Sequence, residues 1–219
     1  MSLTFTKKLL QQIADKVCKT ITANLDDLNK LDSDIGDGDH GTAMLAAMSE
    51  FVKSSRKEGS IKQSLDTIGW DVMSATSGST SALIGAFFTG MSQGVEDNKE
   101  ELDSDAVITM FSAGLKNLQA TSKAKVGDKT MLDAVIPAVN AMEKFRGTGA
   151  ALTEIFFEAA KAARANSNAT SQMVAKHGRA KNLGERSLGH IDAGSSSAAF
   201  MFEAFANEIR ENEASDVER

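Results

Sequence analysis

The sequence predicts an all-α fold built from eight helices. Its 219 residues include one proline and no tyrosine, and they are rich in alanine, leucine, methionine and lysine, which favour helix. Apolar residues recur at three- and four-residue spacing along most of the chain, the period of an amphipathic helix. Alternating β-branched and aromatic runs, which indicate strands, are almost absent.

The first predicted helix is defined by one apolar stripe: Leu9, Leu10, Ile13, Val17, Ile21, Leu25 and Leu28. Seven more amphipathic stretches follow, at 41–57, 61–77, 80–93, 103–121, 129–146, 151–168 and 195–211. Pro137 lies inside the stretch 129–146, and because proline lacks a backbone donor we expect a kink or a wide turn there. The phenylalanines of "FMFEAF" (200–205) have helical spacing and are expected in the core.

The composition is that of an ordinary globular chain, and no segment looks like an interdomain linker, so residues 1–219 are expected to form one domain. No apolar run approaches the roughly 20 residues that span a bilayer, and no secretory signal is recognisable. A single cysteine, Cys18, favours a cytoplasmic location. The net charge of −6 argues against a nucleic-acid partner. Any anion must therefore be bound locally, by backbone amides, a few cations or a metal.

The stretch "DSDIGDGDHGTAM" (32–44) concentrates negative charge in a segment rich in glycine. In a helix, the carboxylates of Asp32, Asp37 and Asp39 would not meet. An offset of five residues turns Asp37 by about 140° from Asp32, and an offset of seven, at about −20°, leaves Asp39 about two turns away. A loop containing glycines can direct all three carboxylates to one point, which is costly unless a cation lies between them. Oxygen ligands favour Mg²⁺, Mn²⁺ or Ca²⁺ over zinc. The alternative is a solvated turn whose aspartates cap the helix at 41–57; an EF-hand does not fit the spacing.

Three other stretches interrupt the helical pattern. In "SATSGSTSA" (74–82), glycine and hydroxyl residues precede a helix, as in a phosphate site or an ordinary N-cap. In "SKAKVGDKTMLDA" (122–134), Asp128 is expected to cap the next helix, and the three lysines are either solvated or one of them faces an anion. The stretch "HGRAKNLGERSLGHIDAGSSS" (177–197) has the length and composition of a lid that carries cations, and its "DAGSSS" segment is expected to cap the last helix.

Neither a P-loop nor a Rossmann glycine motif is present. The segments "LDSDIGDGDHGTAM", "GDKTMLDAVIP" and "HGRAKNLGERSLGHIDAG" together resemble the ADP-binding L subunits of dihydroxyacetone kinases driven by the phosphoenolpyruvate phosphotransferase system. The resemblance spans nearly the whole chain. It implies an antiparallel eight-helix barrel that holds ADP and two Mg²⁺ ions at one end, under a capping loop at about 177–195.

The resemblance also implies a role for individual residues. The Mg²⁺ ligands would be Asp32, Asp37 and Asp39. Arg179 would offset charge on the transferring phosphoryl group, and His40 would hydrogen-bond a phosphate. The remaining nucleotide contacts would come from Gly41, Thr42, Ala43, Ser79, Thr80, Ser122, Met131, Asp192, Ala193 and Gly194. Relatives often carry asparagine at the position of Ala43, so one polar contact of the family is not expected here.

The implied activity is phosphotransfer in the glycerol and dihydroxyacetone metabolism of the cytoplasm. A tightly bound Mg-ADP would accept a phosphoryl group from a phosphohistidine on an M-type subunit and pass it to dihydroxyacetone on a K subunit. This version is preferred because no fused substrate domain is found. Two alternatives stay open: an ATP-exchanging kinase subunit for another short-chain sugar, and a nucleotide-sensing protein that regulates a transcription factor.

Overall fold

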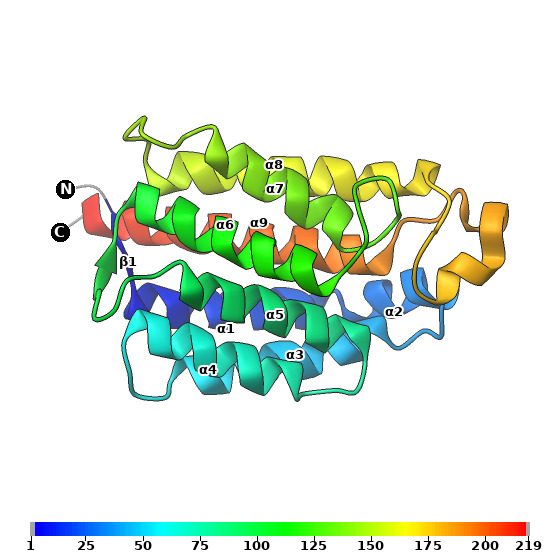
Figure 1. Ribbon diagram of the computed structural model, residues 1–219, viewed down its shortest axis with the longest axis horizontal. Coiled ribbons are helices and arrows are strands. Elements are labelled where there is room, and N and C mark those ends of the chain that lie inside the picture. Colours follow the sequence, from blue (N-terminus) through cyan, green and yellow to red (C-terminus); the bar gives the residue numbers. More distant parts are fainter. Residues whose placement is uncertain (1–2, 218–219) are drawn as a thin grey trace.

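The computed structural model describes residues 3–217, and most of them are helical (Figure 1). The α-helices of this part are α1 (Lys7–Ala23), α2 (Leu25–Ser33), α3 (His40–Ser55), α4 (Ile61–Met73), α5 (Ser79–Gln93), α6 (Ser104–Thr121), α7 (Leu132–Glu143), α8 (Leu152–Ala169) and α9 (Ala193–Val217). Two 3₁₀ segments, η1 (Thr170–Gln172) and η2 (Arg179–Ser187), lie between α8 and α9.

Eight of these helices form a closed ring. From α3 to α9 each helix packs against the next one in the chain, α1 packs against α3, and α9 packs back against α1. The predicted eight-helix barrel is therefore confirmed. Helix α2 is additional and lies against α3 and α9. It arises because the first predicted helix ends at Asn24, whose side-chain amide donates to the carbonyl of Thr20 at 2.8 Å and satisfies an otherwise unpaired C-terminal carbonyl.

Aromatic side chains fill the inside of the ring. Phe111 of α6 is 2% exposed, and its ring centroid lies 5.3 Å from that of Phe156 of α8 and about 6 Å from those of Phe202 and Phe205 of α9. Edge-to-face contacts of this kind add to the hydrophobic stabilisation of burial. The expected core position of "FMFEAF" is confirmed for Phe202 and Phe205.

The structure differs from the expected elements in three places. Two residues of β1 (Phe5–Thr6) pair antiparallel with two of β2 (Glu101–Leu102), a ladder too short to produce a sequence pattern. Helix α7 continues through Pro137, so there is no wide turn at that residue. Helix α4 ends at Met73 and α7 begins at Leu132, so both are shorter than expected. None of the described helices combines the length and apolarity needed to cross a membrane.

Because the helices run alternately up and down, successive connections lie at opposite ends of the barrel. Residues 24–39, 74–78, 122–131 and 170–192 connect helices at the end that carries η2, and 56–60, 94–103 and 144–151 connect them at the end that carries β1 (Figure 1). The four stretches that interrupt the helical pattern of the sequence therefore all meet at one end. Helices α3, α5, α7 and α9 all begin there.

Candidate nucleotide and metal site

The four connections at the end of the barrel that carries η2 surround an open cleft of about 870 Å³. With one exception, the site residues expected from the sequence line it: Asp32, Asp37, Asp39, His40, Thr42, Ala43, Ser79, Thr80, Ser122, Met131, Arg179, Asp192, Ala193 and Gly194. The exception is Gly41, which packs against α2. A Cβ at Gly41 would lie 2.3 Å from the carbonyl oxygen of Leu25, so glycine allows this close approach.

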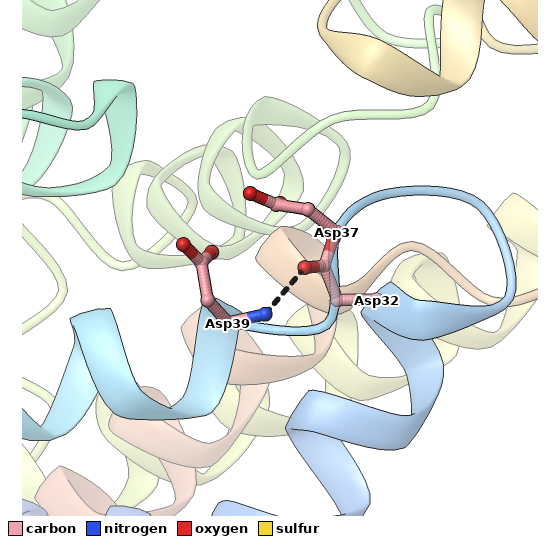
Figure 2. A group of neighbouring side chains, drawn as sticks. All are labelled: Asp32, Asp37 and Asp39. Atoms are coloured by element: carbon pink, nitrogen blue, oxygen red, sulfur yellow. Dashed lines mark hydrogen bonds between the residues drawn. The ribbon is translucent and has the colours of Figure 1, made fainter.

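The acidic turn between α2 and α3 is folded around the carboxylate of Asp32. One Asp32 carboxylate oxygen accepts hydrogen bonds from the amides of Gly38 at 2.8 Å and Asp39 at 3.0 Å. Gly38 has a φ of +78°, which favours glycine, and a Cβ at Gly36 would lie 2.2 Å from the Asp32 carboxylate. Figure 2 shows the Asp39 amide directed at the Asp32 carboxylate, with the Asp37 and Asp39 side chains extending from neighbouring positions of the same turn.

The three carboxylates are suited to a hard divalent cation. One oxygen from each of Asp32, Asp37 and Asp39 lies within 4.8 Å of the others. Asp32 is half-buried, whereas Asp37 and Asp39 are exposed to the cleft. An all-oxygen donor set that leaves room for water and phosphate ligands is typical of Mg²⁺ sites. Asp37 is also paired with a guanidinium nitrogen of Arg179 at 2.5 Å, which places an arginine of the predicted capping loop beside this cluster.

His40 is buried at the start of α3 and connects three helices. The Ser197 hydroxyl donates to the carbonyl of Gly194 at 2.9 Å, so its oxygen accepts from Nε2–H of His40, also at 2.9 Å. Nδ1 then carries no proton and accepts from the Thr80 hydroxyl at 3.4 Å. Burial lowers the pKa of His40 to about 4, although the negative charge of Asp32 opposes this shift. The ring is therefore neutral at pH 7, and its one N–H is engaged by Ser197. The hydrogen bond to a phosphate that the resemblance implies stays a prediction, and it requires the proton to lie on the other ring nitrogen.

Four helix N-termini line the cleft, because α3, α5, α7 and α9 begin at this end. Their first residues, His40, Ser79, Leu132 and Ala193, are all in its wall. Free amide groups and the helix dipole make such termini favourable for anions. The glycine-hydroxyl stretch 74–82 provides one of them, since Gly78 precedes the first residue of α5 and no side chain caps that helix. These termini give an acidic chain local groups that are suited to an anion.

The connection between α6 and α7 corrects one expectation. Asp128 does not cap α7, which begins four residues later. Its carboxylate instead accepts from the amide of Lys125 and from Nζ of Lys176, both at 2.8 Å, and lies 3.3 Å from Nε2 of His177. The hydrogen bond from Lys176 is the main reason that the pKa of Asp128 falls to about 2.

The start of α7 is instead organised by Asp133, whose carboxylate accepts from the amides of Gly127 at 2.6 Å and Thr130 at 2.7 Å. Of the three lysines in this connection, Lys125 is exposed, whereas Lys123 and the buried Lys129 both line the cleft. No local sequence pattern indicates that the connection between α6 and α7 contacts the one between α8 and α9, because the contacting residues are about 40 to 60 positions apart in the chain.

The connection between α8 and α9, residues 170–192, contains the predicted capping loop except for residues 193–195, which form the first turn of α9. It contacts the acidic turn twice, through Arg179 with Asp37 and through Nδ1 of His190 with Asp34 at 3.4 Å. The expected cap of the last helix is present, because Asp192 accepts from the amide of Ser195 at 2.6 Å. Burial raises the pKa of Asp192 to about 7, even though the Ser195 hydrogen bond acts in the opposite direction.

A helical barrel that gathers three carboxylates and four helix N-termini in one cleft defines a class of protein whose donor groups suit a cation and an anion side by side. Within that class, the chain belongs to the DAK2 domain family, whose model matches residues 34–207. This confirms the resemblance to the kinase L subunits that the sequence motifs suggested.

Two curated relatives are of the stand-alone type. The chain is 35% identical to the "PEP-dependent dihydroxyacetone kinase 1, ADP-binding subunit DhaL" of Listeria innocua, over 81% of this chain and 84% of that protein. It is also 35% identical to the "PTS-dependent dihydroxyacetone kinase, ADP-binding subunit DhaL" of Lactococcus lactis, over 80% and 84%. A human relative, "Triokinase/FMN cyclase", is 32% identical over 90% of this chain and 34% of its own length. These relatives are phosphotransferases, which confirms the predicted enzyme class.

Solved structures agree with the fold. The native dihydroxyacetone kinase of C. freundii matches 91% of this chain and 34% of its own chain, with a TM-score of 0.71 and 26% identity. The same enzyme in complex with AMP-PNP and Mg²⁺ matches 94% and 35%, with a TM-score of 0.70 and 25% identity. This chain therefore corresponds to about a third of each of those chains.

Proposed function

We propose that this chain is the nucleotide-binding subunit of a phosphoenolpyruvate-dependent dihydroxyacetone kinase. The observation that carries the proposal is the composition of the cleft, where a cluster of three carboxylates lies beside four helix N-termini. A nucleoside diphosphate with a divalent cation needs both features, because its phosphates favour backbone amides and its metal favours carboxylates. The relatives of similar length are named as ADP-binding subunits.

Asp32, Asp37 and Asp39 would hold two Mg²⁺ ions. When bound, Mg²⁺ would offset negative charge on the phosphoryl oxygens. Asp32 is held in place by the amides of Gly38 and Asp39, hydrogen bonds that the chain makes by itself. Arg179 is close enough to the cluster to add a further positive charge once its contact with Asp37 is exchanged for a phosphate oxygen.

The remaining cleft residues would hold the nucleotide. His40 to Ala43 and Ser79 to Thr80 belong to the first turns of α3 and α5. The amide of Thr42 donates to Asn29 Oδ1 at 3.2 Å and that of Ala43 to the Asp39 carbonyl at 2.9 Å, so a diphosphate would be bound by the amides of the residues before them and of Ser79 and Thr80. Ser122 and Met131 come from the connection between α6 and α7 and would border the nucleoside. The turn Asp192, Ala193 and Gly194 would close the site from the start of α9.

In the proposed reaction, ADP acts as a fixed coenzyme. The N–P bond of a phosphohistidine on an M-type subunit breaks as an O–P bond forms on the terminal phosphate of ADP. The phosphoryl group then moves to a hydroxyl oxygen of dihydroxyacetone on a K subunit, which releases the hydroxyl proton. The described residues of this chain need only position charge, and no covalent nucleophile is required.

The test is whether the protein as isolated carries ADP and divalent ions. The protein is passed through gel filtration, denatured, and its released nucleotide and metal are quantified by mass spectrometry. We expect close to one ADP and two Mg²⁺ per chain, and loss of both in Asp37→Ala. ADP that leaves during gel filtration would favour an exchanging kinase, and Asp37→Ala protein with its full ADP content would refute the metal assignment.

The acceptor and donor are tested by reconstitution. Purified K and M subunits from a relative such as that of Lactococcus lactis are mixed with this chain, phosphorylated M subunit and dihydroxyacetone. We expect dihydroxyacetone phosphate to form without added ATP. A requirement for free ATP would instead assign an ATP-exchanging kinase.

A further inference from the structure

A lysine that neither the metal site nor the phosphate site explains is buried beside the cleft. Lys129, in the connection between α6 and α7, is 2% exposed. Its φ is +61°, a value that side-chain-bearing residues rarely adopt. A strained backbone of this kind persists where the surrounding contacts fix it. Here the contacts are made by the side-chain ammonium group.

The ammonium group of Lys129 bonds to both ends of another connection. Its Nζ donates to the carbonyl of Thr170 at 2.7 Å and also to the carbonyl of His190. Thr170 directly follows α8, and His190 lies three residues before α9. Lys129 therefore bridges the two ends of the segment 171–189. We call this place, where residues 170, 171, 189, 190 and 192 come together, the neck.

Two further hydrogen bonds close the neck from within. The amide of Gly189 donates to the carbonyl of Ser171 at 2.8 Å, and the amide of Asp192 donates to the Thr170 hydroxyl at 2.9 Å. Lys129 differs from these because it reaches the neck from a different connection and carries charge. Hydrogen bonds from a charged donor are roughly twice as strong as neutral ones.

The segment beyond the neck has a small core of its own. Ala175 and Ser187 are buried, the Ala175 amide donates to the Ser187 hydroxyl oxygen at 2.9 Å, and that hydroxyl donates to the carbonyl of Gly184 at 2.6 Å. A segment held together in this way moves as a unit. Two anchors hold the segment: the neck, and Asp128, whose carbonyl accepts from the Lys176 amide at 3.1 Å and whose carboxylate accepts from Lys176 Nζ at 2.8 Å. Together these anchors set the orientation in which Arg179, which the segment carries, faces the acidic turn.

Burying an ammonium group is unfavourable without compensation. Burial lowers the pKa of Lys129, and the carboxylates of Asp192 and Asp133 act against this shift. Both carboxylates accept backbone hydrogen bonds at a helix start beside the cleft, Asp192 at α9 and Asp133 at α7. The lysine therefore joins the neck to the same helix termini that form the floor of the site.

We propose that Lys129 is a positioning residue that holds the segment 171–189 closed over the cleft and thereby slows release of the nucleotide. The first half of this inference stands on the structure alone, and the second half rests on the proposed function. The two halves are separated by the experiments below, because the first is measured without nucleotide.

The first experiment is hydrogen–deuterium exchange of the full-length, nucleotide-free protein. In Lys129→Met, amides of residues 171–189 should exchange about tenfold faster than in the wild type, since at least one charge-assisted hydrogen bond is lost. Amides in α1, α6 and α8 should be unchanged. Lys181→Met is the matched control, because it removes the same charge from an exposed position on the same segment. Lys129→Arg, which retains the charge and the donors, should restore much of the protection.

The second experiment measures the dissociation rate of a fluorescent ADP analogue in the presence of Mg²⁺. Lys129→Met should release it about tenfold faster, with Lys181→Met unchanged. Equal amide exchange rates of residues 171–189 in the wild type and Lys129→Met would refute the proposal that Lys129 holds this segment closed. A uniform rise of the exchange rates across all helices would refute it too. If the segment exchanges faster in Lys129→Met but no variant, the wild type included, binds the analogue, the role of Lys129 in holding the segment is supported and the proposed function is refuted.

Discussion

Asp37→Asn removes one of three negative charges whose oxygens lie within 4.8 Å of one another. Two unit charges at this separation repel by about 1 kcal/mol in water, and by about 3 kcal/mol at an effective dielectric constant of about 20. At the lower of these values, the substitution removes about 2 kcal/mol of repulsion, about 1 kcal/mol from each of Asp32 and Asp39. It gives up about 1 kcal/mol or less from the pair with Arg179, whose side chain is 70% exposed.

The metal-free variant should therefore be more stable than the wild type by about 1 kcal/mol, which corresponds to a Tm about 2–4 °C higher for a chain of this size. With Mg²⁺ the order should reverse. A ligand at about 100 times its Kd stabilises by about 2.7 kcal/mol, and each tenfold loss of affinity removes about 1.4 kcal/mol of this gain. The melting curves of wild type and variant should cross as Mg²⁺ is added.

The assay is thermal unfolding followed by circular dichroism, in chelator and across a Mg²⁺ titration. Asp34→Asn is the matched control, because it makes the same change in the same turn at a carboxylate outside the cluster. It should show the wild-type response to Mg²⁺. If Asp37→Asn melts no higher than the wild type in chelator and gains as much from Mg²⁺, the three carboxylates do not act as one cation site.

Other perturbations test separate parts of the structure. Arg179→Ala should raise the dissociation rate of ADP about tenfold in stopped-flow measurements, whereas Arg186→Ala, an exposed arginine on the same connection, should not. Because the pKa of His40 is about 4 in the folded protein against an ordinary 6.5, its contribution to stability is full above pH 6.5 and is lost as the pH falls towards 4. His40→Gln should flatten this part of the pH profile in urea unfolding. Phe111→Ala should cost about 3–5 kcal/mol of unfolding free energy, and Phe157→Ala, at a side chain that is 60% exposed, about 0.5 kcal/mol or less.

The fold was predictable from the sequence because its helices are amphipathic and its connections are not. The stretches at 32–44, 74–82, 122–134 and 177–197 stand out because glycine, charge and hydroxyl residues break the helical period. That they meet at one end follows from counting: in an up-and-down barrel every second connection lies on the same side. The clustering of the three carboxylates was predictable for a further reason, since a helix would direct Asp37 away from Asp32 and only a loop brings all three together. The cation between them stays a prediction.

Other features depend on contacts between distant residues. Asp128 has the sequence position of a helix cap, but positive φ values at Gly127 and Lys129 precede a later start of α7. Asp133, inside the first turn of α7, accepts from the amides of Gly127 and Thr130 and fixes the connection before the helix. A lysine between Asp128 and Thr130 looks exposed in sequence. Its burial is set by carbonyls of residues 170 and 190, which no local pattern near Lys129 can indicate.

The separation of the two barrel ends gives this protein an unusual freedom for engineering. All four site connections lie at the end that carries η2, whereas β1 and the last turns of α9 lie at the other (Figure 1). Joining the residues beyond these elements with a flexible linker and opening the chain within 147–149 would produce a circular permutant whose cleft is covalently untouched. Reporter domains attached at that opening would sit a full barrel length from the nucleotide.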